Sequence, residues 1–265
     1  MKPREIKARM RGLEQTVSIT RAMQTVAAAK IAPSQAAYEN ACRYRDGLKR
    51  CFDMCAQTVL PTSSIDEKRG LLVVSAERGL CGGYNAGIRT ALQKIDMTGV
   101  KKVYFSGRRA PLPKDVAADV DESFLNMVRR DPFEYGSTVA ATLADEYERG
   151  EIDSVYVLYY DCENSVAPVY KRILPFERSS SSYGADAELS DTEKLFKQLF
   201  AAIVYSVLAS ATVVENITRM SAMKFATTNG DRMLDELSVV FNQTRQNEIT
   251  SELNDTVNAS RSKEI

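Results

Sequence analysis

The first sixty residues of the chain have a helical pattern and no strong strand signal. A continuous helix from Arg4 to Cys55 would be about 75 Å long, which exceeds an ordinary globular helix several times over. Pro33 lies inside this segment, and an interior proline predicts a kink of more than about 20°. The apolar residues that recur at helical spacing, and so define one narrow face, are Ile6, Met10, Leu13, Val17, Met23, Val26 and Ile31.

The last third of the chain repeats this helical pattern. Ser190 and Glu193 have the spacing of a capping box, so we expect a helix from there to about Asn258, on the order of 100 Å long. Its seam contains many small and polar residues, which indicates a weakly packed face. The expected seam positions are Leu195, Leu199, Ala202, Ser206, Ala209, Val213, Ile217, Met220, Lys224, Thr227, Leu234, Leu237, Phe241 and Ile249.

Between the two helical segments the pattern changes to alternating strands and helices. Strands are expected at 71–75, 102–106 and 154–160, with helices near 85–95 and 133–149. This order is typical of a small α/β domain with a mostly parallel sheet. A fourth apolar run at 168–176 follows too closely for a crossover helix and should pair antiparallel. The expected organisation is a helix over 1–60, an α/β domain over 69–177, a flexible loop over 178–189 and a helix over 190–265.

Composition excludes several functional classes. The 35 basic and 35 acidic residues balance, so no overall field attracts nucleic acid or an anionic membrane. With no histidine, the chain cannot form a Ser-His-Asp or Cys-His catalytic arrangement or a histidine-containing zinc site. The carboxylate pairs Asp121-Glu122 and Asp235-Glu236 are adjacent and face different ways, so they define no acid/base couple. The sequence predicts no catalytic residue, cofactor or metal.

The five cysteines and the N-terminus favour a reducing, cytoplasmic location. Five is an odd number, and the cysteines show no regular framework. Cys51 and Cys55 are one helical turn apart, but they lack two further zinc ligands, so we expect a half-buried structural pair. The N-terminus resembles neither a secretory signal nor a transit peptide. The most apolar stretch, 199–214, is shorter than a membrane span and is expected to be a buried helix.

Residues 77–85, ERGLCGGYN, follow a predicted strand and precede a predicted helix. Phosphates bind at this place in many α/β folds, but the loop matches neither GxGxxG nor GxxxxGK[ST]. A tight turn with close backbone packing explains its glycines better than nucleotide binding does. The candidate turn residues are Gly79, Leu80, Cys81, Gly82 and Gly83.

A polar cluster interrupts the C-terminal helical pattern at 241–253, FNQTRQNEITSEL. Arg245 with Gln246, and Thr250 with Glu252, place hydrogen-bonding groups where a simple helix would have core residues. Taken alone, the cluster fits a solvated helix face with ordinary i, i+4 pairs.

Together, three blocks of the sequence resemble the γ subunit of the rotary F-type ATP synthase. They are SITRAMQTVAAAKI (18–31), ERGLCGGYN with SGRR (77–85 and 106–109), and the segment from ENITRMSAMK to NEITSEL (215–253). The resemblance implies a fold in which the terminal helices form an antiparallel coiled coil beside a Rossmann-like domain. It also implies a function, the central shaft that couples ion flow through the membrane sector to ATP synthesis or hydrolysis and influences the regulation of hydrolysis.

The resemblance further implies partners and contact residues. The shaft would turn inside a hexamer of α and β subunits, bind the ε subunit and sit on the ring of c subunits, on the cytoplasmic face of a bacterial plasma membrane. Met23 would lie near an acidic segment of β, and Arg245, Gln246 and Thr250 would contact a loop of β. The chain itself would not be an enzyme and would bind no small-molecule substrate or nucleic acid.

Two other functions stay open from the residues alone. A stand-alone nucleotide-binding α/β protein would use the loop at 77–85 for phosphate. A homodimeric coiled-coil scaffold would use the terminal helices to pair with a second copy of the chain.

Overall fold

A computed structural model describes residues 3–55, 67–113, 118–125, 132–176 and 189–261. Two very long helices bracket the fold, α1 (Pro3–Cys55) and α4 (Leu189–Arg261). Between them lie β1 (Arg69–Val74), α2 (Tyr84–Leu92), β2 (Val100–Ser106), β3 (Asp119–Asp121), α3 (Pro132–Glu148), β4 (Ser154–Tyr159) and β5 (Val169–Leu174). The residue contacts divide the chain into two units, one formed by 28–219 and the other by 1–27 with 220–265.

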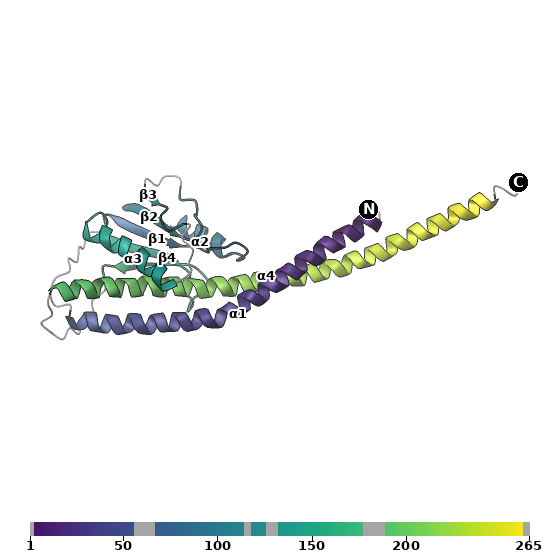
Figure 1. The fold of residues 1–265 in the computed structure, drawn as a ribbon. Helices are drawn as coiled ribbons and strands as arrows, with labels where there is room; N and C mark the ends of the chain where they lie inside the picture. The colour runs from purple at the N-terminus through teal and green to yellow at the C-terminus, as the bar shows by residue number, and fades with distance from the viewer. Residues whose placement is uncertain (1–2, 56–66, 114–117, 126–131, 177–188, 262–265) are drawn as a thin grey trace. The chain divides into compact units, whose positions relative to one another are not determined.

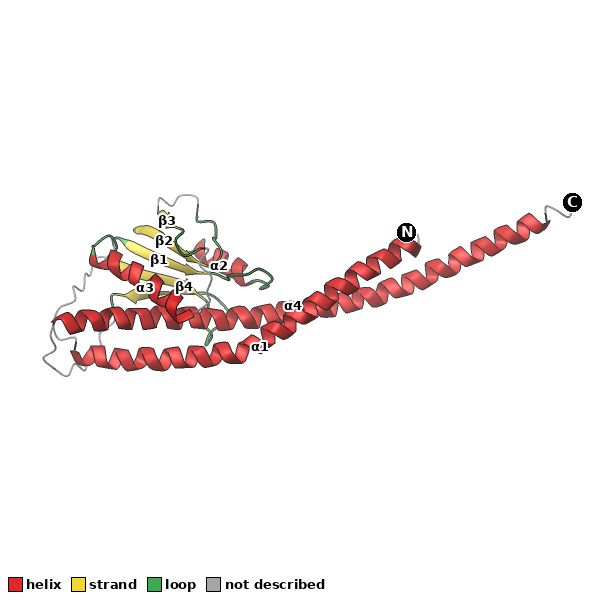
Figure 2. Ribbon diagram, in the orientation of Figure 1, coloured by secondary structure: helices red, strands yellow, loops and turns green. Residues whose placement is uncertain are grey.

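The larger unit contains a five-stranded sheet with strand order β3-β2-β1-β4-β5 (Figure 2). Strands β1, β2, β3 and β4 are parallel, and β5 alone is antiparallel, paired with β4. Right-handed crossovers in a parallel sheet place helices on both faces, as in Rossmann-like folds. The predicted α/β arrangement and the antiparallel fourth run are therefore confirmed.

Alternate residues of the strands point into two separate cores. Leu72, Val74 and Tyr104 pack with α3 and α4 on one face, whereas Leu71 and Val73 pack with α2 on the other. Figure 1 shows α3 and the part of α4 within the larger unit along one side of the sheet, while α2 belongs to the core on the other face. Because successive strand side chains point to opposite faces, central strands buried on both sides become continuously apolar, as in the run from Gly70 to Val74.

Within the larger unit, α4 is a core helix. No side chain from Leu199 to Asn216 is exposed, as the sequence predicts for the apolar stretch at 199–214. One window of α4 is also long and apolar enough to cross a membrane, but 72% of that window is buried inside the protein. A mostly buried core helix of a globular protein passes the same test of length and composition, so this window is weak evidence for a membrane span.

The two long helices run antiparallel in each unit. In the larger unit, Asn216 donates a hydrogen bond to Ser34 (2.9 Å), and Arg45 donates one to Ser206 (3.5 Å). In the smaller unit, the hydroxyls of Thr20 and Thr227 are 2.9 Å apart. Partner numbers on α4 decrease as those on α1 increase, which is the register of an antiparallel pair.

Several details differ from the sequence-based expectation. Val26 is 57% exposed and Ala27 takes its place in the helix interface, while Lys224 is exposed and Met223 is buried instead. The short strand β3 has the polar sequence Asp-Val-Asp and was not predicted, because three residues are too few for a periodic signal. Helix α4 begins at Leu189, so Ser190 lies inside it and is not its cap.

Three further expectations concern local features. α1 continues through Pro33, and the predicted kink stays a prediction. Cys51 is exposed, so the predicted half-buried pair with Cys55 is wrong for Cys51. The loop predicted at 178–189 lies outside the described residues except for Leu189.

Candidate functional site

The glycine-containing loop at 77–85 forms a compact turn between β1 and α2. Leu80 and Gly82 have positive φ angles of 61° and 56°, a conformation that glycine adopts without strain. Gly82 therefore has the conformational role predicted for it. A side chain at Gly83 would meet nothing within 4 Å, and one at Gly79 would make only ordinary contact with Arg108, so for these two glycines the prediction of close packing is wrong.

Cys81 is buried in this turn, whereas Leu80 is 60% exposed. Burial raises the pKa of the Cys81 thiol, and the nearby charge of Glu215 adds to that effect. A thiol with a raised pKa is a poor nucleophile at neutral pH. The turn thus contains an inert structural cysteine.

An ion pair on α4 holds the turn in place. Arg219 and Glu215, one helical turn apart, form a salt bridge in which both side chains are about nine-tenths buried. Arg219 also donates to the backbone carbonyl of Arg78, 3.4 Å away. Arg219 belongs to the block at 215–253, so two of the blocks recognised in the sequence, 77–85 and 215–253, are in contact at this point. A basic and an acidic residue at i, i+4 on a helix are the only sequence signal for this contact.

A second loop packs behind the first. Gly107 has φ of +107°, and a Cβ at this position would lie 2.3 Å from the carbonyl oxygen of Ser75. Only glycine fits here, because the obstacle is backbone and cannot move aside. The SGRR segment at 106–109 is thus fixed against the end of β1, next to the turn that starts at residue 77.

In the smaller unit, Met23 is half-buried on α1. The surrounding interface is made of small and polar groups: Thr227 is 7% exposed, and a Cβ on Gly230 would lie 2.4 Å from Val17 Cγ2. The glycine lets the two helices approach closely. On the outside, Arg21 and Asp231 form a solvent-exposed salt bridge at 3.0 Å.

The C-terminal part of α4 has a different surface. Every side chain from Asn242 to Val257, except that of Thr244, is exposed, including Arg245, Gln246 and Thr250. The Thr250 hydroxyl donates to the carbonyl of Gln246, 2.9 Å away. Arg245 has no ion-pair partner among the described residues. The structure places these three residues near one another but does not bring Met23 to them, since about 20 helical residues, or about 30 Å, separate Thr227 from Arg245 along α4.

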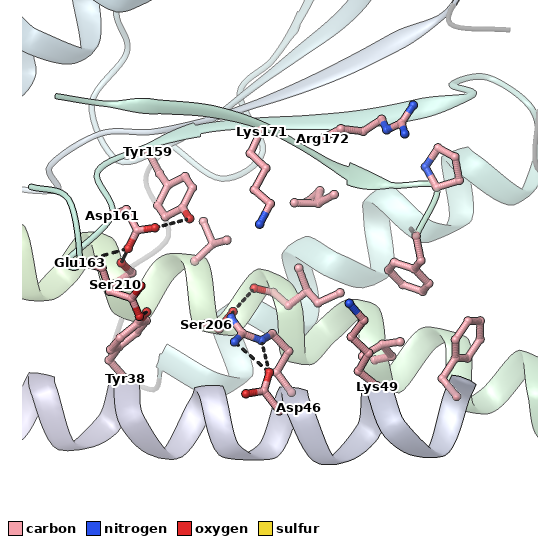
Figure 3. Close-up of a pocket in the computed structure, with 18 of the residues that line it drawn as sticks. Tyr38, Asp46, Lys49, Tyr159, Asp161, Glu163, Lys171, Arg172, Ser206 and Ser210 are labelled. Atoms are coloured by element: carbon pink, nitrogen blue, oxygen red, sulfur yellow. Dashed lines mark hydrogen bonds and ion pairs between the residues drawn. The ribbon is translucent and has the colours of Figure 1, made fainter. Parts of the chain in front are cut away.

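The larger unit also contains a cavity of about 360 Å³ between α1, α4 and the β4–β5 edge of the sheet (Figure 3). At one end, Asp161 accepts hydrogen bonds from Tyr159 (3.3 Å) and Ser210 (3.4 Å). Burial and the neighbouring Asp161 raise the pKa of Tyr159, so its phenol stays protonated. On the opposite wall, Arg45 pairs with Asp46 at 2.9 Å.

Among the described residues, no group of three or more His, Cys, Asp or Glu side chains is arranged to hold a metal ion.

The family model described as "ATP synthase" matches residues 2–262, almost the whole chain. The chain belongs to the ATP synthase gamma-chain family. The ATP synthase gamma chain of Chlorobium phaeobacteroides is 28% identical, with 96% of each chain covered. The gamma chain of Staphylococcus carnosus is 29% identical, also with 96% of each covered.

Solved structures agree on the fold of this family. A chain of the Euglena gracilis mitochondrial ATP synthase, from an OSCP/F1/c-ring assembly, has a TM-score of 0.67 over 98% of this chain and 94% of that one, at 12% identity. A chain from the Tetrahymena thermophila central stalk and c-ring has a TM-score of 0.56 at 20% identity and covers 78% of this chain and 99% of that one. The expected combination of a coiled coil and a Rossmann-like domain is thereby confirmed.

Proposed function

We propose that this chain is the central rotor shaft of an ATP synthase, a non-catalytic subunit that couples ion flow to the nucleotide-binding subunits around it. Membership of the gamma-chain family supports this function. It does not favour the two alternatives, a stand-alone nucleotide-binding protein and a homodimeric scaffold. The absence of a phosphate-binding motif in the turn at 77–85 also argues against the first of them.

One observation supports the shaft most directly: the end of α4 has an apolar stripe that no described part of the chain covers. Ile249, Leu253 and Val257 recur at four-residue intervals and are 45%, 61% and 49% exposed. Thr20 faces Thr227, so the register places the start of α1 opposite about residue 244 of α4. Beyond that point none of the described residues provides α4 with a helical partner, and a surface of this kind suits enclosure by other subunits.

The proposed surroundings follow from this surface. The end of α4 would turn inside a hexamer of α and β subunits, with Arg245, Gln246 and Thr250 reaching a loop of β and Met23 lying lower on the shaft. The α/β domain would contact the ε subunit and the ring of c subunits at the cytoplasmic face of a bacterial plasma membrane. The stripe occupies only one side of the helix, so the hexamer would meet a different surface at each angle. Rotation would then bias each β site in turn between its conformations and couple the shaft to synthesis, hydrolysis and their regulation.

The first test is the composition of the native complex. The tagged chain, purified gently from its host, should appear in a native mass spectrum as one copy bound to a hexamer of two larger chains, and the same fraction should hydrolyse ATP. Recovery as a monomer or homodimer without ATPase activity would contradict the proposal.

A second test addresses the contact residues. Arg245→Ala should lower ATP hydrolysis by the assembled complex several-fold, because a charge-assisted hydrogen bond contributes about 1.5–3 kcal/mol. Arg245 is exposed in the free chain, so the free energy of unfolding of the isolated subunit should hardly change. Arg43→Ala, at an exposed position of α1 in the larger unit, is the matched control. Equal turnover of both variants in complexes of normal composition would remove Arg245 from the proposed contact.

A further inference from the structure

The cavity between α1, α4 and β5 has a feature that the rotor function does not explain: a lysine on the core-facing side of an edge strand. Val169 and Ile173, which flank Lys171 at alternate positions of β5, both pack against the core that contains α4. Side chains two apart on a strand share a face, so Lys171 belongs to the same face. Figure 3 shows it extending from β5 toward the two helices, whereas Arg172, which also lines the cavity, lies along the strand.

A second cation approaches from the opposite wall. Lys49 lies on α1 and lines the same cavity, and Figure 3 shows it directed from the helix toward the sheet. The described residues provide no ion-pair partner for Lys49 or for Lys171. Arg45, one turn before Lys49, adds a guanidinium whose contacts are with Asp46 and Ser206.

Most of the carboxylates in the cavity are already engaged. Asp161 accepts hydrogen bonds from Tyr159 and Ser210, Asp46 pairs with Arg45, and Glu163 accepts one from Tyr38 at 3.4 Å. Asp53 is the remaining lining carboxylate, and no described residue forms a hydrogen bond or ion pair with it. The wall of the cavity thus presents two solvent-exposed ammonium groups and one partly buried carboxylate that have no ion-pair partner among the described residues, an excess of available positive charge.

We propose that this cavity binds a small soluble anion that carries phosphate groups, held between Lys171 of β5 and Lys49 of α1 with Arg45 at its side. Lysine ammonium groups bind phosphate as mobile point charges, and a cavity of about 360 Å³ is within the size range of small-molecule sites. Such an anion would connect the edge of the sheet to the helix pair. It would therefore stabilise the packing of the sheet against α1 and α4 inside the larger unit.

The test uses the full-length chain and inorganic pyrophosphate as the probe, measured by isothermal titration calorimetry at low ionic strength. We expect saturable binding at one site. Lys171→Met and Lys49→Met, which keep an unbranched side chain and remove the charge, should each weaken binding about tenfold or more. Asp53→Asn should strengthen binding, because it removes the unpaired carboxylate. Lys101→Met, at an exposed position of β2 outside the cavity, should leave binding unchanged.

Other outcomes would overturn the proposal. Absence of saturable binding at millimolar pyrophosphate, or equal weakening by Lys101→Met, would exclude the site. If wild type does not bind and Lys171→Met aggregates, the lysine instead protects an edge strand from pairing with other chains. Tighter binding to phosphatidylglycerol vesicles than to pyrophosphate, lost in the same variants, would assign the site to a lipid headgroup. If Lys171→Met fails to fold, as judged by circular dichroism, Lys49→Met on the helix decides the question.

Discussion

Helix α4 has two very different environments along its length. In the larger unit, from Leu199 to Val214, its side chains are apolar, aromatic or small on all sides and none is exposed. In the part of α4 that belongs to the smaller unit, Met223, Thr227 and Gly230 are the only buried positions whose side-chain environment the structure describes, and many apolar side chains are exposed. A helix that is apolar all round indicates a core within its own chain, while a narrow buried stripe beside exposed apolar residues indicates a surface that other chains cover.

The largest expected effect contrasts two phenylalanines on α4. Phe200 is fully buried and Phe225 is 70% exposed. Phe200→Ala should lower the free energy of unfolding by about 3–5 kcal/mol, because it leaves a cavity in the core. Phe225→Ala should change it by no more than about 0.5 kcal/mol. Urea denaturation of the full-length chain measures both changes. Similar losses of unfolding free energy in the two variants would contradict the proposed difference between the two parts of the helix.

The ion pair that anchors the turn at 77–85 should come next. Arg219→Ala leaves Glu215 buried without its partner, and we expect a loss of about 2–4 kcal/mol. The double variant with Glu215→Ala should recover part of that loss, since it removes the unpaired charge. Denaturation of the single and double variants measures the coupling. Additive losses would show that the pair does not act as a unit.

Close packing in the smaller unit should have an intermediate effect. Alanine improves helix propensity over glycine by about 1 kcal/mol, but at Gly230 its Cβ would overlap Val17. We expect the steric cost of this overlap to exceed the gain in helix propensity, so that the variant is destabilised by about 1 kcal/mol. Hydrogen exchange of the amides in this helix pair should detect it. Adding Val17→Ala should restore protection, and a gain in protection from Gly230→Ala alone would mean that the helices can move apart.

The smallest effect is expected at the surface of the same helix pair. Arg21 and Asp231 form a salt bridge, but their side chains are 62% and 48% exposed. A double-mutant cycle with alanine should give a coupling of about 0.2–1 kcal/mol that decreases with added salt. A larger, salt-insensitive coupling would show that this pair is shielded from solvent.

The sequence predicts the fold well where the signal is long or repeated. The strands around Leu72, Tyr104 and Val157 and the two terminal helices are where periodicity places them. Small shifts occur where several residues at a helix interface have similar character: Val26 against Ala27, and Lys224 against Met223, differ by one position, or 100° of rotation. In both cases the structure buries a residue that periodicity alone did not select: the small Ala27, which allows the helices to approach closely, and the apolar Met223 in place of a charged lysine.

The site was less predictable from the sequence. The turn at 77–85 was located correctly, but the role of Arg219 depends on a contact across 141 positions of sequence that no local pattern reports. Gly107 is similar, because its requirement comes from a carbonyl oxygen on another strand. The proposed contact residues on α4 are exposed and form no hydrogen bond or ion pair with another described element, so their proposed contacts depend on other chains; they are Arg245, Gln246 and Thr250.

The hydrogen bond between Thr20 and Thr227 joins positions that are 207 residues apart in the chain. At a synthesis rate of about 5–20 residues per second, roughly 10–40 s pass between the emergence of the two threonines from a ribosome. Throughout this interval the start of α1 exists without its partner, whereas β1, β2 and β4 can already pair. The helix pair is then the last region to form during biosynthesis. Until it forms, the first helix exposes its apolar face, so this is the segment that a chaperone would protect most.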